Sequence, residues 1–235
     1  MTRTPLVVAV DGPSGSGKSS VSRQVAAQLD LAYLDTGAMY RAATWRCVQR
    51  GVDLMDTALV ADTVRSMVLQ LDLNPRFPSF VVDGVDVGVA IRAPEISAVV
   101  SQVATNLEVR ADLGERQRRV IAVERTPDGF SGGRGIVVEG RDITTVIAPD
   151  ADVRLLLTAS EEARLARRAR EVHGTDDAAA LEATREHVVD RDARDSTVVE
   201  FRTAADGVVT VDSSGLDLEQ TVQAVLALVE DVAGR

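Results

Sequence analysis

The chain alternates between short, continuously apolar runs and longer stretches in which apolar positions recur with helical spacing. The apolar runs that predict buried strands lie at 6–10, 32–34, 135–138, 153–157 and 208–211. The stretches that predict helices lie at 17–29, 37–50, 160–171 and 217–233. Strands that alternate with helices are typical of an α/β protein with a parallel sheet, so we predict that class.

The middle of the chain has a different pattern. Apolar and polar residues alternate over 80–87 around an Asp83-Gly84 pair, which predicts a small β-hairpin inserted between helices. The stretches 126–135 and 173–177 look like loops, but neither is long enough to link two domains. We therefore predict one domain over 1–235 that carries an insert.

Composition narrows the classes of function. The 235 residues carry a net charge of −10 and only 3% aromatic residues, which argues against general binding to nucleic acid. The single cysteine, Cys47, cannot form an internal disulfide and fits a reducing compartment. The apolar run at 6–10 is too short for a signal peptide, and no stretch approaches the ~18 apolar residues of a membrane span. We expect a cytoplasmic protein with no nucleic-acid or membrane partner.

A glycine-rich loop follows the first predicted strand and opens the first predicted helix. It fits the pattern G-x-x-x-x-G-K-[ST], whose backbone N–H groups cradle phosphates at a helix N-terminus. Lys18 is placed to reach the β- and γ-phosphates, and the Ser19 hydroxyl is placed to ligate Mg²⁺. A chance Gly/Ser-rich turn is the alternative, but context and spacing both favour a nucleoside triphosphate site. Its residues are Gly12, Pro13, Ser14, Gly15, Ser16, Gly17, Lys18, Ser19 and Ser20.

Lys18 is the only lysine among 26 basic residues; the other 25 are arginines. The chain uses arginine wherever a cation is needed, except in this loop. A compact ammonium fits inside a phosphate cradle where a planar guanidinium does not.

Several classes of phosphate-loop protein remain to be separated. The Asn-Lys-x-Asp motif that reads guanine cannot occur, because no lysine follows position 18. The run 136–139 resembles the strand that ends in a Mg²⁺-binding carboxylate in larger ATPases, but it leads into Gly140-Arg141-Asp142. A small kinase fits the length better. Arg41, on a predicted helix, and Arg141, after a predicted strand, are candidate cations for its acceptor; a solvated helix face is the alternative for Arg41.

Together with the phosphate loop, these segments resemble the bacterial cytidylate kinases, and the likeness extends over nearly the whole chain. The segments 34–41 (Leu-Asp-Thr-Gly-Ala-Met-Tyr-Arg) and 139–142 (Glu-Gly-Arg-Asp) at this spacing are much more specific than the loop. Further matching segments are 86–87, 91–92, 99–104, 109–110, 149–151 and 191–195. The resemblance implies a P-loop kinase fold: a five-stranded parallel sheet flanked by helices, with a nucleoside-monophosphate-binding insert at about 42–100 and a lid at about 164–195.

The resemblance also implies an acceptor site. Residues matching Arg41 and Arg141 hold the monophosphate, a task that suits the guanidinium fork. Those matching Thr36, Arg110 and Asp142 lie at the cytosine. The exocyclic amine of cytosine donates a hydrogen bond that a carboxylate can accept. Those at the sugar match Ser101, Arg191 and Asp195, and Tyr40 belongs to the same acceptor set. Without the resemblance, Ser101 is an ordinary helix hydroxyl and Arg191 pairs with Asp192 or Asp195 on a solvated helix.

Four arginines crowd the helix expected after 153–157, at 164, 167, 168 and 170. The resemblance places a lid here that closes over the ATP phosphates, and we favour Arg167 and Arg168 for that role, with Arg194 as a further candidate. We therefore expect the catalytic cations to be Lys18, Arg141, Arg167, Arg168 and Arg194. A solvated basic face paired with nearby glutamates is the alternative.

Two positions depart from the family pattern. Val198 stands where an arginine that helps to hold the acceptor is usual, and Arg202 is a candidate substitute from a different backbone position. Thr144 replaces a usual glycine, so we expect the loop after Asp142 to differ.

The sequence thus predicts a monomeric kinase that transfers the γ-phosphoryl group of ATP, with Mg²⁺, to CMP or dCMP, giving CDP or dCDP and ADP. No general base is assigned, because the accepting phosphate oxygen is already ionised at pH 7. Two alternatives stay open: a kinase of another small acceptor, and a non-catalytic ATP-binding protein whose acceptor site has decayed.

Overall fold

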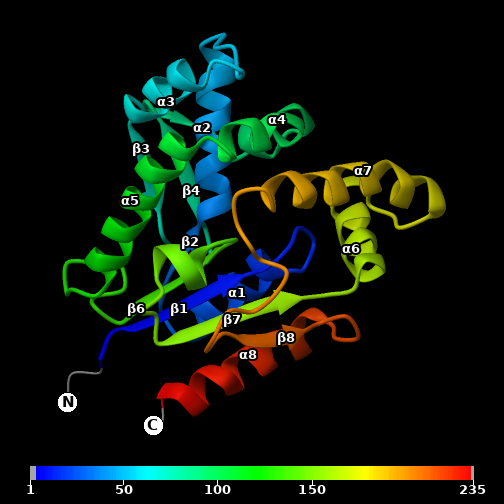
Figure 1. Ribbon diagram of the computed structural model, residues 1–235. Helices are drawn as coiled ribbons and strands as arrows, with labels where there is room; N and C mark the ends of the chain where they lie inside the picture. Colours follow the sequence, from blue (N-terminus) through cyan, green and yellow to red (C-terminus); the bar gives the residue numbers. More distant parts are fainter. Residues whose placement is uncertain (1–3, 234–235) are drawn as a thin grey trace.

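A five-stranded parallel sheet forms the centre of the computed structural model, which describes residues 4–233 apart from the side chains of 186, 187, 190 and 233. The strand order is β2-β6-β1-β7-β8, with helices on both faces (Figure 1). The strands are β1 (Leu6–Asp11), β2 (Ala32–Asp35), β6 (Gly135–Gly140), β7 (Val153–Thr158) and β8 (Val209–Asp212). All five strands predicted from the sequence are confirmed, and so is the α/β class.

The strands are apolar throughout because both of their faces are covered. Along β1, Val7 and Ala9 pack with α2 (Thr36–Gln49) and α5 (Leu107–Glu124). Val8 and Val10 point the other way, toward α1 (Lys18–Gln28) and α8 (Leu218–Ala233). Side chains alternate across a strand, so a continuous apolar run serves two cores at once.

An insert between β2 and β6 forms the upper part of the molecule in Figure 1. It begins with α2 and continues through the elements α3 (Thr57–Arg65), β3 (Leu69–Asp72), β4 (Ser79–Val82), β5 (Val85–Asp86), the short 3₁₀ turn η1 (Ala90–Arg92), α4 (Pro94–Ala104) and α5. The predicted hairpin is β4–β5, and its turn residues Asp83 and Gly84 have φ of 48° and 85°. The sequence did not predict β3, because only four residues show its alternation.

Two helices, α6 (Glu161–His173) and α7 (Ala178–Asp195), pack against each other beyond β7. They meet at the predicted break, where Gly174 ends α6 with φ of 74°. Helix α7 also contacts α4 of the insert, so the pair lies opposite the insert across the edge of the sheet (Figure 1). Its position corresponds to the expected lid, whose closure stays a prediction.

A single π-helical turn, η2 (Ile143–Ile147), follows β6 and Gly140-Arg141-Asp142. The buried carboxylate of Asp11, at the end of β1, accepts from the backbone N–H groups of Ile143 and Thr144, each at 2.8 Å. The Thr144 hydroxyl donates to the same carboxylate at 2.6 Å. The departure at Thr144 therefore adds a bond that a glycine could not make.

Within the part of the chain that the structure describes, no helix combines the length and the apolar character that crossing a membrane requires.

Candidate active site

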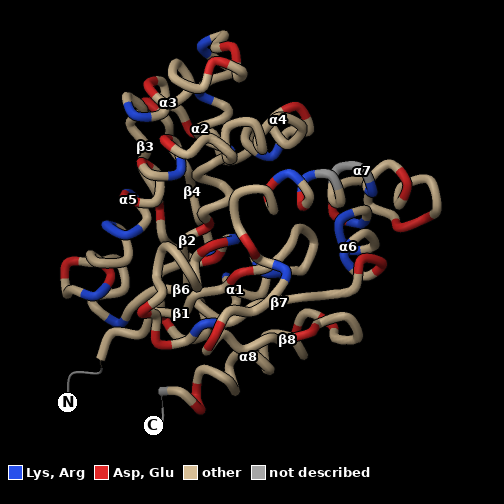
Figure 2. The backbone as a smooth tube through the Cα atoms, viewed as in Figure 1, with Lys and Arg blue, Asp and Glu red and all other residues tan. Residues whose placement is uncertain are grey.

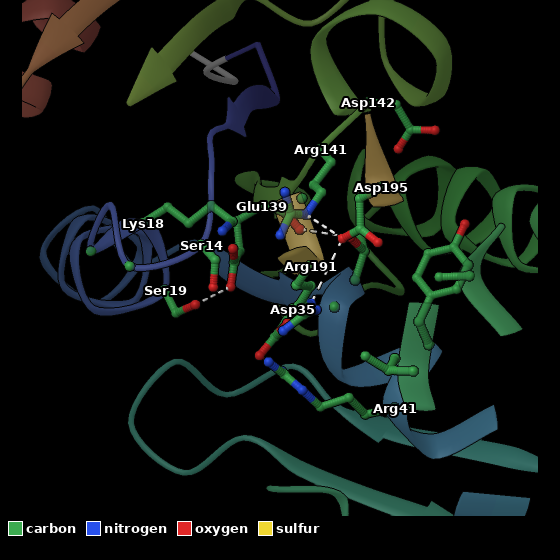
Figure 3. Close-up of a pocket in the computed structure, with 18 of the residues that line it drawn as sticks. Ser14, Lys18, Ser19, Asp35, Arg41, Glu139, Arg141, Asp142, Arg191 and Asp195 are labelled. Atoms are coloured by element: carbon green, nitrogen blue, oxygen red, sulfur yellow. Dashed lines mark hydrogen bonds and ion pairs between the residues drawn. The ribbon is translucent and has the colours of Figure 1, made fainter. Parts of the chain in front are cut away.

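A cavity of about 500 Å³ opens at the carboxyl edge of the sheet, between the insert and the α6–α7 pair (Figure 3). Parallel strands all end at this edge, and open α/β sheets bind their ligands there. Most of the residues predicted from the sequence line this one cavity: Ser14, Gly15, Gly17, Lys18, Ser19, Ser20, Thr36, Tyr40, Arg41, Arg110, Arg141, Asp142, Arg168, Arg191 and Asp195. Gly12, Pro13 and Ser16 belong to the same loop without lining the cavity wall.

The loop between β1 and α1 has the form that the sequence predicts. Gly15 and Gly17 have φ of 76° and 87°, in the left-handed region that favours glycine. A Cβ at Gly12 would lie 2.3 Å from the backbone oxygen of Leu157, and one at Gly15 would lie 2.7 Å from that of Arg164. The loop is thus held tightly between β7 and α6, with the N-terminus of α1 at the cavity.

Lys18 is partly buried at the start of α1, and its Nζ donates to the Pro13 carbonyl at 3.2 Å. Burial lowers the pKa of this ammonium to about 8, although the nearby Glu139 carboxylate opposes the shift. Loss of hydration is the larger effect. A buried cation of this kind gains most from an anion placed beside it.

Glu139, the next-to-last residue of β6, lies beside Ser14 and Ser19 of the phosphate loop (Figure 3). Its Oε1 accepts from the Ser19 hydroxyl at 2.5 Å and from the Tyr33 hydroxyl at 3.1 Å. Burial, followed by the charge of Asp35, raises the pKa of Glu139 to about 7, while Lys18 opposes the rise. Glu139 was not among the predicted site residues, although the apolar run that ends in it was visible in the sequence.

Three arginines converge opposite the phosphate loop. Burial is the main cause that lowers the pKa of Arg41 and brings that of Arg191 to about 9. The Nε of Arg41 is buried and has no hydrogen-bond partner among the described residues. Arg141 lies beside them, with its Nε 3.0 Å from Asp195 (Figure 3). Partly buried guanidinium groups, one of them with an unused Nε donor, form a site that suits an anion.

Asp195 lines this cavity and contacts Ser101, a predicted site residue that is not part of the cavity lining. The Ser101 hydroxyl donates to Asp195 at 2.9 Å, and Arg191 lies 3.7 Å from the same carboxylate. The sequence offered two readings for these residues, and the structure excludes a solvated surface because Ser101 and Asp195 are both buried.

The pocket wall nearest α5 carries the residues expected to lie at the cytosine ring. Arg110 forms an ion pair with Asp142, and its guanidinium lies 5.8 Å from the centre of the Tyr40 ring. Burial raises the pKa of the Asp142 carboxyl, and Arg110 opposes that rise. Thr36 opens α2 and donates its hydroxyl to the Glu139 carbonyl at 2.8 Å.

The predicted lid arginines have different positions. Figure 2 shows the basic positions that follow one another along α6. Arg168 lines the cavity and pairs with Glu171 at 2.7 Å. Arg167 instead donates to the carbonyls of Ser16 at 3.1 Å and Ser213 at 2.5 Å. Arg194 is exposed on α7, outside the cavity. The roles of all three in catalysis stay predictions.

The departure at Val198 leaves an apolar wall in the cavity. Arg202 does not substitute for the missing arginine, because its side chain is exposed and does not line the cavity. The buried ring of Phe201 instead lies 4.3 Å from the Arg141 guanidinium, a cation–π contact that fixes this arginine.

A phosphate loop at the carboxyl edge of a parallel sheet, facing partly buried arginines across a cavity beside two packed helices, defines a phosphate-loop kinase. Comparison with known proteins agrees: a family model described as cytidylate kinase matches residues 8–231. The chain belongs to the cytidylate kinase family.

Curated relatives match nearly the full chain. The cytidylate kinase of Streptomyces avermitilis is 45% identical over 96% of this chain and 93% of its own. That of Cutibacterium acnes is 47% identical over 97% of this chain and 98% of its own. A solved structure, TT1252 from Thermus thermophilus, is 20% identical over 95% of this chain and 97% of its own, with a TM-score of 0.40, a likeness too distant to bear on function.

Proposed function

We propose that the protein transfers the γ-phosphoryl group of ATP to CMP or dCMP, producing ADP and CDP or dCDP. The observation that carries the proposal is that a phosphate loop and a separate cluster of partly buried arginines face one cavity, with the Asp142 carboxylate at its far wall. Two phosphate-binding sites in one cavity suit a reaction between two nucleotides better than simple ATP binding.

Phosphoryl transfer needs positioning and charge neutralisation more than covalent chemistry from the protein. Lys18 and the α1 N-terminus would hold the donor phosphates, and Arg41 and Arg141 would hold the accepting phosphate. Its oxygen is already ionised at neutral pH, so no general base is required. Arg168, on the lid side of the cavity, would neutralise charge on the group in transfer.

The residues around Ser19 fit a Mg²⁺ ion. Its hydroxyl lies 2.5 Å from the Glu139 carboxylate, and both are hard oxygen donors beneath the phosphate loop. A buried carboxylate with a raised pKa gains from a divalent cation at this point. When bound, Mg²⁺ would supply charge to the β- and γ-phosphate oxygens. The Ser19 hydroxyl would ligate it, with Glu139 orienting the hydroxyl.

Asp142 supports the choice of cytosine. A carboxylate accepts a hydrogen bond from the exocyclic amine of cytosine, whereas uracil presents an acceptor at the same position. The ion pair with Arg110 favours the ionised carboxylate that this task needs. At the sugar, Asp195, which accepts from Ser101 at 2.9 Å, offers a carboxylate to ribose hydroxyls, but CMP and dCMP both fit the proposal.

A panel of acceptors tests the proposal. We expect ATP-dependent formation of ADP with CMP and dCMP at kcat/KM at least tenfold above that with UMP, AMP or GMP. Preference for another acceptor would instead show a kinase of different specificity. Absence of turnover with every acceptor, while ATP binding is retained, would show a decayed acceptor site.

We also propose a monomer in a reducing compartment with no nucleic-acid partner. The lone cysteine, Cys47, fits the reducing compartment, and the net charge of −10 argues against a nucleic-acid partner. Light scattering tests the monomeric state, and a filter-binding assay with duplex DNA tests nucleic-acid binding.

A further inference from the structure

We propose that Asp192, on α7, is a positioning residue that joins the lid to the phosphate loop and fixes the two arginines on either side of the transfer point. The proposal rests on the kinase activity proposed above. It concerns a carboxylate to which neither the phosphate loop motif nor the expected acceptor set assigns a role.

Asp192 makes contacts with three other segments. Its Oδ1 accepts from the backbone N–H of Ser14 at 3.0 Å and from Arg141 at 2.8 Å. Its Oδ2 accepts from Arg164 at 2.5 Å. The residue is only 2% exposed. One side chain therefore connects α7 to the phosphate loop, to the segment after β6 and to α6.

The connection to the phosphate loop is made on both sides of Ser14. While Asp192 accepts from the Ser14 N–H, Arg164 donates to the Ser14 carbonyl at 2.8 Å. The Asp192–Arg164 ion pair thus binds both the backbone N–H and the backbone carbonyl of Ser14. An ion pair of this geometry specifies how the lid helices are placed against the loop, because both partners must be in position together.

Electrostatics explain why a carboxylate is needed at this point. Burial alone would raise the pKa of Asp192, but the charge of Arg141 and the Ser14 N–H bond outweigh it, and the pKa is lowered. Lys18 and Arg191 lie in the same cation-rich region as Arg141. Without the Asp192 charge, Arg141 would keep Asp195 as its one carboxylate partner among the described residues, and its repulsion with Lys18 and Arg191 would be less fully compensated.

Arg141 is held on three sides as a result. Asp192 and Asp195 accept from its guanidinium at 2.8 Å and 3.0 Å, and the Phe201 ring lies 4.3 Å from it. The arginine that would hold the accepting phosphate is therefore oriented by the lid itself. This couples acceptor positioning to lid closure, and closure excludes the water that would hydrolyse ATP.

The test compares Asp192→Asn with Glu161→Gln. The Glu161–Arg185 ion pair, at 2.7 Å, also joins α6 to α7, but both side chains are about half exposed and neither lines the cavity. For each variant, the rate of transfer to CMP and the rate of ATP hydrolysis without acceptor are measured. Their ratio does not depend on how much of the protein is folded.

For Asp192→Asn we expect transfer to fall at least tenfold and the hydrolysis-to-transfer ratio to rise at least fivefold, with less than a twofold change for Glu161→Gln. An unchanged ratio in Asp192→Asn would overturn the proposal, even if the protein were less stable. Asp192→Glu, which keeps the charge, should recover part of the wild-type ratio.

Hydrogen exchange provides a readout that does not depend on activity. In Asp192→Asn the amide of Ser14 and those of α6 should exchange faster than in the wild type, whereas in Glu161→Gln the Ser14 amide should not. Equal exchange at Ser14 in wild type and Asp192→Asn would contradict the link. A wild type without kinase activity toward any acceptor would refute the proposed function, and the exchange result would then decide the link on its own.

Discussion

The substitution Lys18→Arg retains a positive charge and should nevertheless abolish most of the activity. Lys18 is partly buried, with its Nζ 3.2 Å from the Pro13 carbonyl of the phosphate loop. Arginine adds two heavy atoms and a rigid plane to the tip of the side chain. The loop has no room to widen on the side of α6, because a Cβ added at Gly15 would lie only 2.7 Å from the Arg164 backbone oxygen.

The size of the effect follows from the task of the lysine. Removal of one aligned donor to the charge that develops in a transition state costs roughly 10²–10³ in kcat, or about 2.7–4 kcal/mol. A misplaced guanidinium should lose this contribution almost completely. We therefore expect Lys18→Arg to behave like Lys18→Met, which keeps the stem and lacks the charge.

The assay is ADP release with saturating ATP and CMP, with thermal unfolding and circular dichroism to show that each variant is folded. The comparison of Lys18→Arg with Lys18→Met separates charge from shape. If Lys18→Arg kept at least a third of wild-type kcat while Lys18→Met did not, charge alone would suffice and the steric reasoning would be refuted.

Three further predictions concern other residues of the site. Asp142→Ala should reduce the preference for CMP over UMP at least tenfold with less than a twofold change in KM for ATP, and an equal loss of both would count against its role at the base. Thr144→Val should lower the free energy of unfolding by about 1–3 kcal/mol in urea titrations, because the buried Asp11 carboxylate loses its hydroxyl donor, whereas Thr144→Ser should retain most of the stability. Because burial lowers the pKa of Lys18 to about 8, the lysine is charged below that pH and neutral above it. The kcat/KM for ATP should therefore decline above about pH 8, and a profile that is flat to pH 9.5 would show that this proton is not needed.

The fold could be predicted from the sequence because its signals are local. A run such as 153–157 is apolar at every position, which indicates a strand covered on both faces, and such strands occur mainly in parallel sheets. The two-residue turn at Asp83-Gly84 identified the hairpin. The strand β3 was missed because four residues are too few to distinguish alternation from chance.

Without the family resemblance, the residues themselves predict the site only where they are consecutive. The phosphate loop is one such segment, and its glycines, lysine and serine have fixed spacing. Arg164 and Asp192 were not assigned roles, because their contact with Ser14 joins residues 150 and 178 positions apart. On an Arg- and Asp-rich helix, such residues look like a solvated surface, since charged side chains are seldom buried.

A signal for Asp192 was nevertheless present in the spacing of α7. Thr184, Val188, Asp192 and Asp195 follow one another at intervals of four, four and three, so they share one face of the helix. All four are buried. A stripe that starts with small and apolar residues and continues into two carboxylates indicates that the carboxylates are buried too. Buried carboxylates need cationic partners, and the 25 arginines of this chain supply them. Such a stripe on a lid helix therefore predicts arginines fixed at the site, which is where the structure places Arg141 and Arg164.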